Sequence, residues 1–386
     1  MSTESTGKWT DRIKLPRIFL IIVCALPAVM TILFYVLRSG REVMDWVAAY
    51  ISSPIRGFLG LLSSVYPFSV MEVLCSAAAV WLIYFLVRTV MVTVRRRGKL
   101  KILSKRLLTL IVAVLYVWSI YCFLWNSGYF ATGFAERNGF SGEGVAHDDL
   151  ISVTRLFAEK ANEFAPQVKR DEEGRFIEDR REFFAASTEI YNSITAEFPC
   201  LEGSIYRPKP MMYSWVMSRT GYTGIYFALT GESNINIRAP GFLMPATVAH
   251  ELAHQRGVFA EDEANFVGIA ACVTSGNAVY EYAGWLMGLM YLSGALSFTD
   301  LGAWLEISGG LCEEVNRDWR DNYDFWQAQK TFDTSIDLIN DILAAVNETI
   351  SDAVDTIYDG YLRSQSQELG IRSYGACVDL LVEYFS

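Results

Sequence analysis

The chain has 386 residues, 52% of them hydrophobic, and a formal net charge of −10. This hydrophobic share is high for a wholly soluble protein, so we expect part of the chain to lie in a lipid bilayer. Acidic residues are absent between Glu72 and Glu136 but abundant after residue 140, and such an acidic region argues against a nucleic-acid partner.

Three apolar segments are long enough to cross a bilayer as helices, at about residues 17–37, 68–94 and 107–125. A crossing takes about 20 helical residues. The first segment follows basic residues, as the apolar part of a signal peptide does, but it is longer and no cleavage motif follows it. We therefore predict that it is retained and that residues 1–125 form a membrane domain with three transmembrane helices.

A cluster of arginines and lysines between residues 95 and 106 indicates the orientation. Short loops rich in these residues stay in the cytoplasm, so we expect this loop and, by counting crossings, the N-terminus to be inside. Arg38, Arg41 and Arg56 place positive charge in the preceding loop as well. The count predicts a multi-pass protein of the plasma membrane, with residues 126–386 forming an extracytoplasmic domain.

Residues 126–386 have the pattern of one mostly helical domain. A further apolar stretch, 267–296, is long enough for a fourth crossing, but it contains Glu281 and the sequence Ser275-Gly276-Asn277. An ionisable group within a membrane is costly, and small polar residues next to glycine interrupt helices. We predict two helices buried in the soluble domain and separated at these three residues.

A change of pattern between Met211 and Ile237 predicts β-structure before the next helix. Residues 212–216 and 225–229 are rich in aromatic and aliphatic side chains typical of strands, and Gly221 and Gly224 separate them. The expected fold class is therefore mainly α, with a small β-hairpin or sheet.

The most informative segment is His250-Glu251-Leu-Ala-His254, an HExxH motif. Pro245 suits the first turn of a helix and Gly257 its end, so the motif is predicted to lie on a helix of about three turns. Two histidines four residues apart project from the same face and can share one zinc ion. Glu251 beside them can take a proton from an attacking water and pass it to a leaving amine. The alternative is a chance pattern on an ordinary helix, but the chain has only 3 histidines in all, and two of them are in this motif. The third, His147, is predicted to be a solvated residue.

A catalytic zinc ion needs a third protein ligand and one open position for water. Glu261 follows the motif at the start of a second predicted helix and is the expected third ligand, with Glu263 as the fallback. Asn265, one turn later, is expected to accept a hydrogen bond from a ligand histidine. The alternative is that these acidic residues only stabilise the start of their own helix. A simple metzincin pattern is excluded because Ala260 occupies its third-ligand position.

Together these segments resemble an uncharacterised family of bacterial membrane proteins, numbered 3810 among the domains of unknown function, that carries a predicted zinc-metallopeptidase motif. The resemblance covers nearly the whole chain and implies three N-terminal helices followed by a helical, zincin-like extracytoplasmic domain. The Glu261 segment is also similar to zinc peptidases in which the first Glu of Glu-x-x-Ala-Asp binds the metal, although Asn265 replaces that aspartate with an uncharged group. Besides the HExxH helix, the matching segments are residues 66–72, 209–214, 224–234, 261–266 and 370–375.

Two further segments are candidates for a role in hydrolysis. Residues 226–234 would form an edge strand that aligns an extended peptide beside the metal, or a strand that packs beneath the motif helix. Arg372 and Tyr374 near the C-terminus are candidates for stabilising an oxyanion, or for an ordinary capping or core role, and Tyr374 is the one we name as a catalytic candidate.

The sequence therefore predicts a membrane-anchored zinc metallopeptidase that binds one zinc ion and acts on a peptide or protein substrate. Two alternatives stay open, a zinc-binding sensor or scaffold without turnover and an intramembrane protease. The second is disfavoured because the segment around His250 lacks an apolar span of about 20 residues. The sequence does not specify the substrate, the cleavage preference or the oligomeric state.

Overall fold

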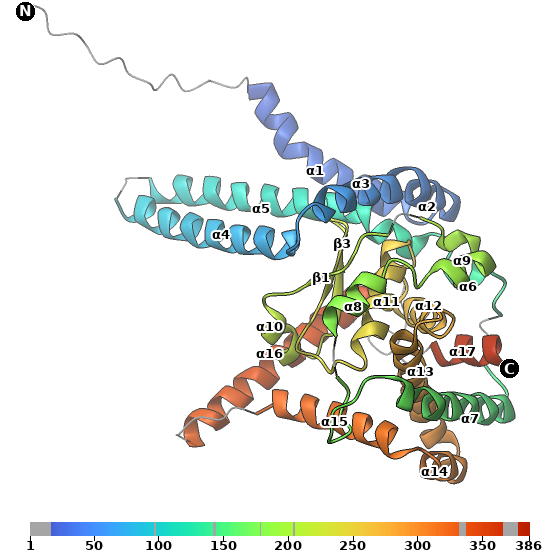
Figure 1. Cartoon of the computed structure of the whole chain (residues 1–386). Coiled ribbons are helices and arrows are strands. Elements are labelled where there is room, and N and C mark those ends of the chain that lie inside the picture. Colours follow the sequence, from blue (N-terminus) through green and yellow to red (C-terminus); the bar gives the residue numbers. More distant parts are fainter. Residues whose placement is uncertain are drawn as a thin grey trace, which may run out of the picture.

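The computed structural model describes residues 17–95, 98–141, 144–177, 179–203, 205–331, 337–365 and 377–386. Within these residues the protein is mainly α-helical, with one three-stranded sheet, as the sequence predicts. Figure 1 shows a long helical hairpin that projects to one side of a group of helices gathered around the sheet.

Three helices of the described chain are long and apolar enough to cross a membrane: α1 (Arg17–Leu37), α4 (Val70–Arg95) and α5 (Lys99–Leu124). Most of their large apolar side chains are exposed, as expected for helices that face lipid. Helices α4 and α5 form the projecting hairpin in Figure 1. Helix α5 begins at Lys99, before the apolar segment that starts at about residue 107. Lysine and arginine are good helix formers, so the helix continues beyond its apolar part.

Three helical segments connect α1 to α4, namely α2 (Arg41–Val47), the π-helix η1 (Ala48–Ser52) and α3 (Ser53–Ser64). Of these, η1 and α3 pack against α5, α2 packs against η2 (Asn126–Phe130), and α3 also contacts the sheet. The predicted loop between the first two apolar helices is therefore helical, and in Figure 1 α2 and α3 lie beside the end of α5, along one side of the sheet and the other helices.

The main hydrophobic core lies among five helices. The apolar stretch predicted to form two helices does so, and the two helices flank the predicted break with their apolar side chains in this core. The side chain of Asn277 at the break accepts hydrogen bonds from the N–H groups of Val279 and Tyr280, which fixes the start of the second helix. The five helices are α7 (His147–Phe164), α11 (Met244–Gln255), α12 (Glu261–Val273), α13 (Ala278–Thr299) and α17 (Cys377–Phe385).

The remaining helical elements are short connections and peripheral helices. Of these, α16 (Asp337–Ser364) matters most here, because its C-terminal part reaches the candidate site. The others are η2 (Asn126–Phe130), α6 (Phe134–Arg137), η3 (Ala165–Gln167), α8 (Arg180–Ala186), α9 (Asn192–Glu197), η4 (Pro199–Leu201), α14 (Leu301–Gly309) and α15 (Glu313–Gln329).

The sheet has the order β1-β3-β2, with β1 (Lys209–Pro210) parallel and β2 (Gly224–Phe227) antiparallel to the central strand β3 (Glu232–Ile235). Of the two predicted strands, only the second, at residues 225–229, overlaps a strand, β2, and β2 pairs with β3. Residues 226–234, expected to form one strand, instead contain the end of β2, a turn and the start of β3. The strand expected at residues 212–216 is wrong, because this segment leads into helix α10 (Ser214–Arg219). Its backbone has no strand partner because Glu72 of α4 accepts the N–H groups that would pair.

Glu232 of the central strand joins the sheet to α4. Its carboxylate accepts hydrogen bonds from the N–H groups of Val70 and Met71, at 3.0 and 2.9 Å, in the first turn of that helix. These N–H groups have no partner within the helix, and a carboxylate also suits the positive end of the helix dipole. The ammonium group of Lys209 lies 3.2 Å from Glu232 Oε1, and both side chains are buried.

Glu72 of α4 makes the converse contact with the body of the protein. Its carboxylate accepts hydrogen bonds from the N–H groups of Met212 and Tyr213, at 2.9 and 2.7 Å, just before α10. Each part thus binds backbone groups of the other through a buried carboxylate, so α4 and the sheet are held together as one unit. Three segments singled out by the sequence, 66–72, 209–214 and 224–234, meet at this junction.

Candidate metal centre

The HExxH motif lies on α11, as predicted. Pro245 occupies the first turn, where its missing N–H is not needed, and Gly257 follows the helix with a φ of 87°. The backbone carbonyl of Glu251 accepts a 2.8 Å hydrogen bond from the hydroxyl of Ser233 in the central strand. This contact helps to fix which face of α11 is turned away from the sheet.

Helix α12 packs closely against α11. Glu261, the first residue of α12, therefore lies beside the HExxH motif. Gly268 makes this packing possible, because a Cβ at that position would lie 2.8 Å from the backbone nitrogen of His250. Any other residue would push the two helices apart. The position of Glu261 relative to the two histidines thus depends on Gly268, which lies on the same helix as Glu261.

The structure brings the three predicted metal ligands together. One ligand atom each from His250, His254 and Glu261 lies within 4.8 Å of the other two, the only such cluster found in the described part of the chain. Glu261 Oε2 lies 3.2 Å from His250 Nε2 and 3.6 Å from His254 Nε2. The two imidazole rings are nearly perpendicular, with centroids 4.7 Å apart. These atoms can therefore converge on a single cation.

His254 is held in place from two sides. Its Nδ1 lies 2.7 Å from the carbonyl oxygen of Val258. Because a carbonyl only accepts, Nδ1 carries a proton, and the neutral ring presents the lone pair of Nε2 to the cluster. On its other side the ring meets Trp125, at the end of α5, edge to face with centroids 5.4 Å apart. The candidate site thus adjoins the end of an apolar helix.

Burial and charge act in opposite directions on the pKa values of the ligands. Burial raises the pKa of Glu261, but the two histidines outweigh it and hold that pKa far below its usual value. Burial lowers the pKa of His254, but Glu261 and then Glu251 raise it to about 9. Without a cation the cluster is therefore a carboxylate paired with an imidazolium, and a metal ion has to displace a proton from His254.

Glu251 is buried next to the ligands. Burial raises its pKa to about 7, although His250 and His254 act to lower it. Gly224 of β2 lies against its carboxylate, because a Cβ at that position would be 2.5 Å from Glu251 Oε1. A carboxyl group whose pKa lies near neutral pH suits a general base.

A cavity of about 340 Å³ opens beside His250 and Glu251. Its walls come from residues 220–224, from α11, α12 and α13, and from Ser351 and Asp355 of α16. The volume is at the lower end of the range for ligand-binding pockets, about 300–1,000 Å³. Because β2 is an edge strand that begins at this cavity, a bound extended peptide has backbone groups available beside it.

Two tyrosines at the site were missed by the sequence analysis. Tyr358 of α16 donates a 2.6 Å hydrogen bond to Glu261 Oε1. The hydroxyl of Tyr222, at the cavity wall, lies 3.2 Å from Asp355 Oδ1, also on α16. The sequence around α16 has only the pattern of an acidic, amphipathic helix, and nothing in that pattern says which face it turns to the motif.

The predicted role of Asn265 is not observed. Asn265 lines the cavity with His250, but Nδ1 of His250 has no hydrogen-bond partner among the described residues. The ring of His254 is oriented by a backbone carbonyl instead. Tyr374 and Arg372, the candidates for oxyanion stabilisation, lie outside the described residues. His147 pairs with Asp300 at 3.2 Å, apart from the cluster.

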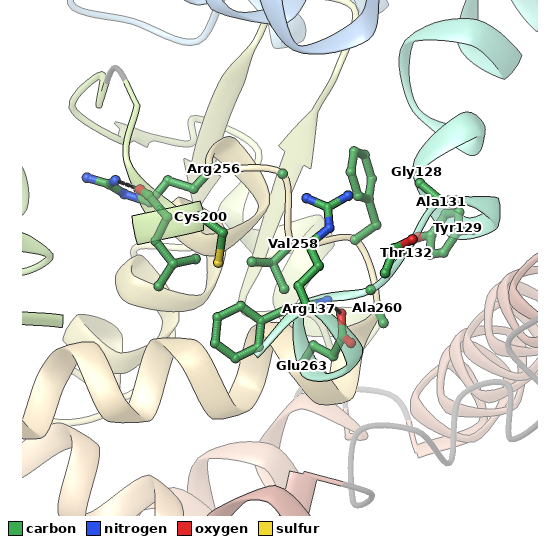
Figure 2. A pocket seen from close by; sticks show the side chains of 15 residues that line it. Gly128, Tyr129, Ala131, Thr132, Arg137, Cys200, Arg256, Val258, Ala260 and Glu263 are labelled. Carbon is green, nitrogen blue, oxygen red and sulfur yellow. Dashed lines mark hydrogen bonds between the residues drawn. The ribbon is translucent and has the colours of Figure 1, made fainter. Parts of the chain in front are cut away.

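Glu263, the fallback ligand, lies in a different pocket, of about 170 Å³ (Figure 2). Its carboxylate accepts the N–H groups of Phe134 and Ala135, each at 2.9 Å, at the start of α6. Figure 2 shows it in this pocket together with Arg137 and Arg256. Burial raises the pKa of Glu263 to about 7, against the effect of these backbone hydrogen bonds. Glu263 thus caps a helix and does not join the cluster.

Arg56 of α3 places a buried positive charge behind the motif helix. Its guanidinium donates a 3.1 Å hydrogen bond to the carbonyl oxygen of His254. It also lies 4.9 to 5.7 Å from the ring centroids of Phe259, Trp125 and Tyr226. A cation is favourable at the C-terminal end of a helix and over aromatic faces. The connection between the first two apolar helices is therefore part of the support of the site.

The side chains of the cluster fit a zinc ion. Two imidazole nitrogens and one carboxylate oxygen are ligands that zinc takes, and three protein ligands leave one position open. Glu261 Oε2 is buried and has no hydrogen-bond partner among the described residues, although it faces both histidines. A buried carboxylate oxygen that makes no hydrogen bond is costly, and a cation between these three groups would bind it directly.

Comparison with known proteins identifies a family. The sequence model of the family described as "Protein of unknown function (DUF3810)" matches residues 48–382, a range that contains both α11 and α12. No curated protein and no solved structure matches the chain.

Proposed function

Because the chain belongs to this DUF3810 family, whose description names no activity, we propose its function from the site: it is a membrane-anchored zinc metallopeptidase that hydrolyses peptide bonds. The observation that carries the proposal is the approach of His250, His254 and Glu261 to within 4.8 Å of one another, with Glu251 buried beside them. This set of groups is what hydrolysis assisted by a metal requires.

His250, His254 and Glu261 hold the metal in this proposal. A zinc ion there would polarise the carbonyl of the substrate and make water a stronger acid. Glu251 takes the proton from the attacking water and passes it to the nitrogen of the leaving amine. Tyr358 keeps the carboxylate of Glu261 in place through its hydrogen bond.

The substrate in this proposal is a peptide segment in an extended conformation. It lies along the free edge of β2, whose N–H and C=O groups can pair with it. The first residue of that strand, Gly224, contacts Glu251, so a peptide on this edge passes the general base. The contact of the Trp125 ring, at the end of the apolar helix α5, with His254 supports a cleft close to the membrane. The segment cleaved is therefore one close to the membrane, on the extracytoplasmic side.

A zinc-binding sensor or scaffold without turnover is the second candidate. The observation that favours it is the position of α16, which lines the cavity through Ser351 and Asp355 and contacts Glu261 through Tyr358. A helix in this position restricts access to the cluster. The two candidates share the zinc site and differ in turnover.

The test uses the full-length protein in lipid nanodiscs. Zinc content per chain is measured by mass spectrometry, and hydrolysis is followed with a complex peptide mixture. The wild type and His147→Ala, which changes the histidine outside the cluster, are expected to bind one zinc ion and cut peptides. Glu251→Gln is expected to keep the zinc but lose hydrolysis, and His254→Ala to lose both.

Three results separate the possibilities. Hydrolysis that survives in Glu251→Gln would contradict the assigned base. Zinc content that is unchanged in His254→Ala would contradict the assigned ligands. Zinc bound by the wild type, without cleavage of any peptide, would favour the sensor.

A further inference from the structure

An apolar patch surrounds the start of α10, and nothing in the described chain covers it. Residues 210–218 contain no charged side chain. Met212 is 63% exposed and Trp215 57% exposed, and Tyr213 and Val216 are exposed as well. We call these four side chains the α10 patch. Contiguous apolar side chains on a protein surface mark a contact with another apolar phase or molecule.

Contacts with α4 fix the position of the α10 patch along the axis of that helix. The carboxylate of Glu72 binds the backbone N–H groups of Met212 and Tyr213. The hydroxyl of Tyr213 lies 3.1 Å from Ser76 Oγ. Ser76 is six residues beyond Val70, the first residue of α4, which is about 9 Å along the helix axis. The patch therefore lies level with the first turns of a helix that is apolar enough to cross a membrane.

The surface of α4 at the same level is also apolar and exposed. Val73 and Leu74, between Glu72 and Ser76, are both exposed. If lipid covers these side chains of α4, the same lipid layer reaches the neighbouring patch. Tryptophan and tyrosine prefer the boundary between hydrocarbon and water, where the ring is in an apolar environment and the polar group is hydrated.

We propose that the α10 patch lies in the interfacial layer of the bilayer and contacts lipid. The occupant is a lipid surface and not a protein, because the patch is continuous with the lipid-facing side of α4 and is held there by Glu72 and Ser76. The patch thus gives the body of the protein a second contact with the membrane, in addition to the three apolar helices. This inference does not depend on the proposed activity.

Site-specific photocrosslinking in lipid nanodiscs tests the proposal. The full-length protein carries p-benzoylphenylalanine in place of Trp215 or, separately, Met212, and lipid adducts are detected by mass spectrometry of the intact protein. Ile83, exposed near the middle of α4, is the positive control. Phe298, which is 94% exposed at the end of α13, is the control for an apolar side chain outside the patch.

We expect lipid adducts at Trp215 and Met212 with a yield at least a third of that at Ile83, and a background yield at Phe298. Yields at both patch positions that equal the Phe298 background would overturn the proposal. So would crosslinks at either patch position to a second copy of the chain or to another protein in native membranes, in place of lipid. The two patch positions are independent, so a folding defect in one variant leaves the other as the test.

Discussion

Tyr358 donates a 2.6 Å hydrogen bond to Oε1 of Glu261, although 97 residues separate them in the chain. The other carboxylate oxygen, Oε2, faces His250 and His254. The tyrosine thus holds one oxygen of the carboxylate and leaves the second for a metal ion. This relationship makes α16 part of the site and leads to the first prediction.

Tyr358→Phe should weaken zinc binding, because Glu261 then loses the group that orients it. Loss of such a contact to a ligand typically lowers metal affinity by about 10- to 100-fold. Affinity is measured by competition with a chromophoric chelator. Tyr323→Phe is the matched control, because that ring is exposed on α15 and removal of its hydroxyl should leave affinity unchanged. Equal affinity of the Tyr358 variant and the wild type would contradict the role assigned to this hydrogen bond.

Gly224→Ala should lower the rate of hydrolysis without removing the metal. The new Cβ would lie 2.5 Å from Glu251 Oε1, so the carboxylate has to move. A displacement of about 1 Å at a catalytic group costs up to about 100-fold in kcat/KM. Gly294→Ala is the control, because a Cβ there meets nothing within 4 Å. If the Gly224 variant kept full activity and unchanged zinc content, the position of Glu251 against Gly224 would not be required for hydrolysis, which would contradict the prediction.

Zinc binding should release a proton at neutral pH. Glu261 and Glu251 raise the pKa of His254 to about 9, so this ring is protonated near pH 7 when no metal is present, and zinc binds only its neutral form. The apparent affinity for zinc should therefore rise by about tenfold per pH unit up to about pH 9 and then level off. Calorimetry in buffers of different ionisation enthalpy counts the proton. An enthalpy that does not depend on the buffer would contradict the prediction.

Glu232→Gln should destabilise the protein strongly. The change leaves Lys209 buried without its 3.2 Å charge partner and weakens the contact to the first turn of α4. Removing one member of a buried pair costs about 3–5 kcal/mol. Thermal unfolding of the full-length protein in detergent measures the effect. The control is Glu136→Gln, whose pair with Arg41 is exposed on both sides and should contribute little. Similar unfolding temperatures for the two variants would contradict the assigned role of the junction.

The features that local pattern determines were predictable from the sequence. The spacing of His250 and His254 fixes a shared face only if α11 is a helix, and Pro245 and Gly257 mark its ends. Apolar length identified the three membrane-crossing candidates, and Ser275-Gly276-Asn277 marked the break between α12 and α13. These signals lie within about one helix length of the feature they predict.

The features that depend on distant contacts were not predictable. Residues 212–216 have the composition of a strand, but Glu72, far away in the sequence, takes the N–H groups that a strand would use. Tyr358 contacts Glu261 only because of the way α16 packs, and the sequence around Tyr358 does not predict this contact. Glu263 lies two residues after Glu261 on α12, so its side chain points to another face of the helix, where it meets the N–H groups of α6. Tertiary contacts overrode local preference in each case.

The carboxylates of Glu72 and Glu232 limit the movement of the candidate site relative to α4. Each binds backbone N–H groups on the opposite side of the junction, so the cleft has a fixed stand-off from α4 and does not swing on a tether. An anchored protein with a long linker samples many heights above its anchor. In the proposed peptidase the cleft is held at one height, so substrate segments outside that narrow zone are out of its range whatever their sequence.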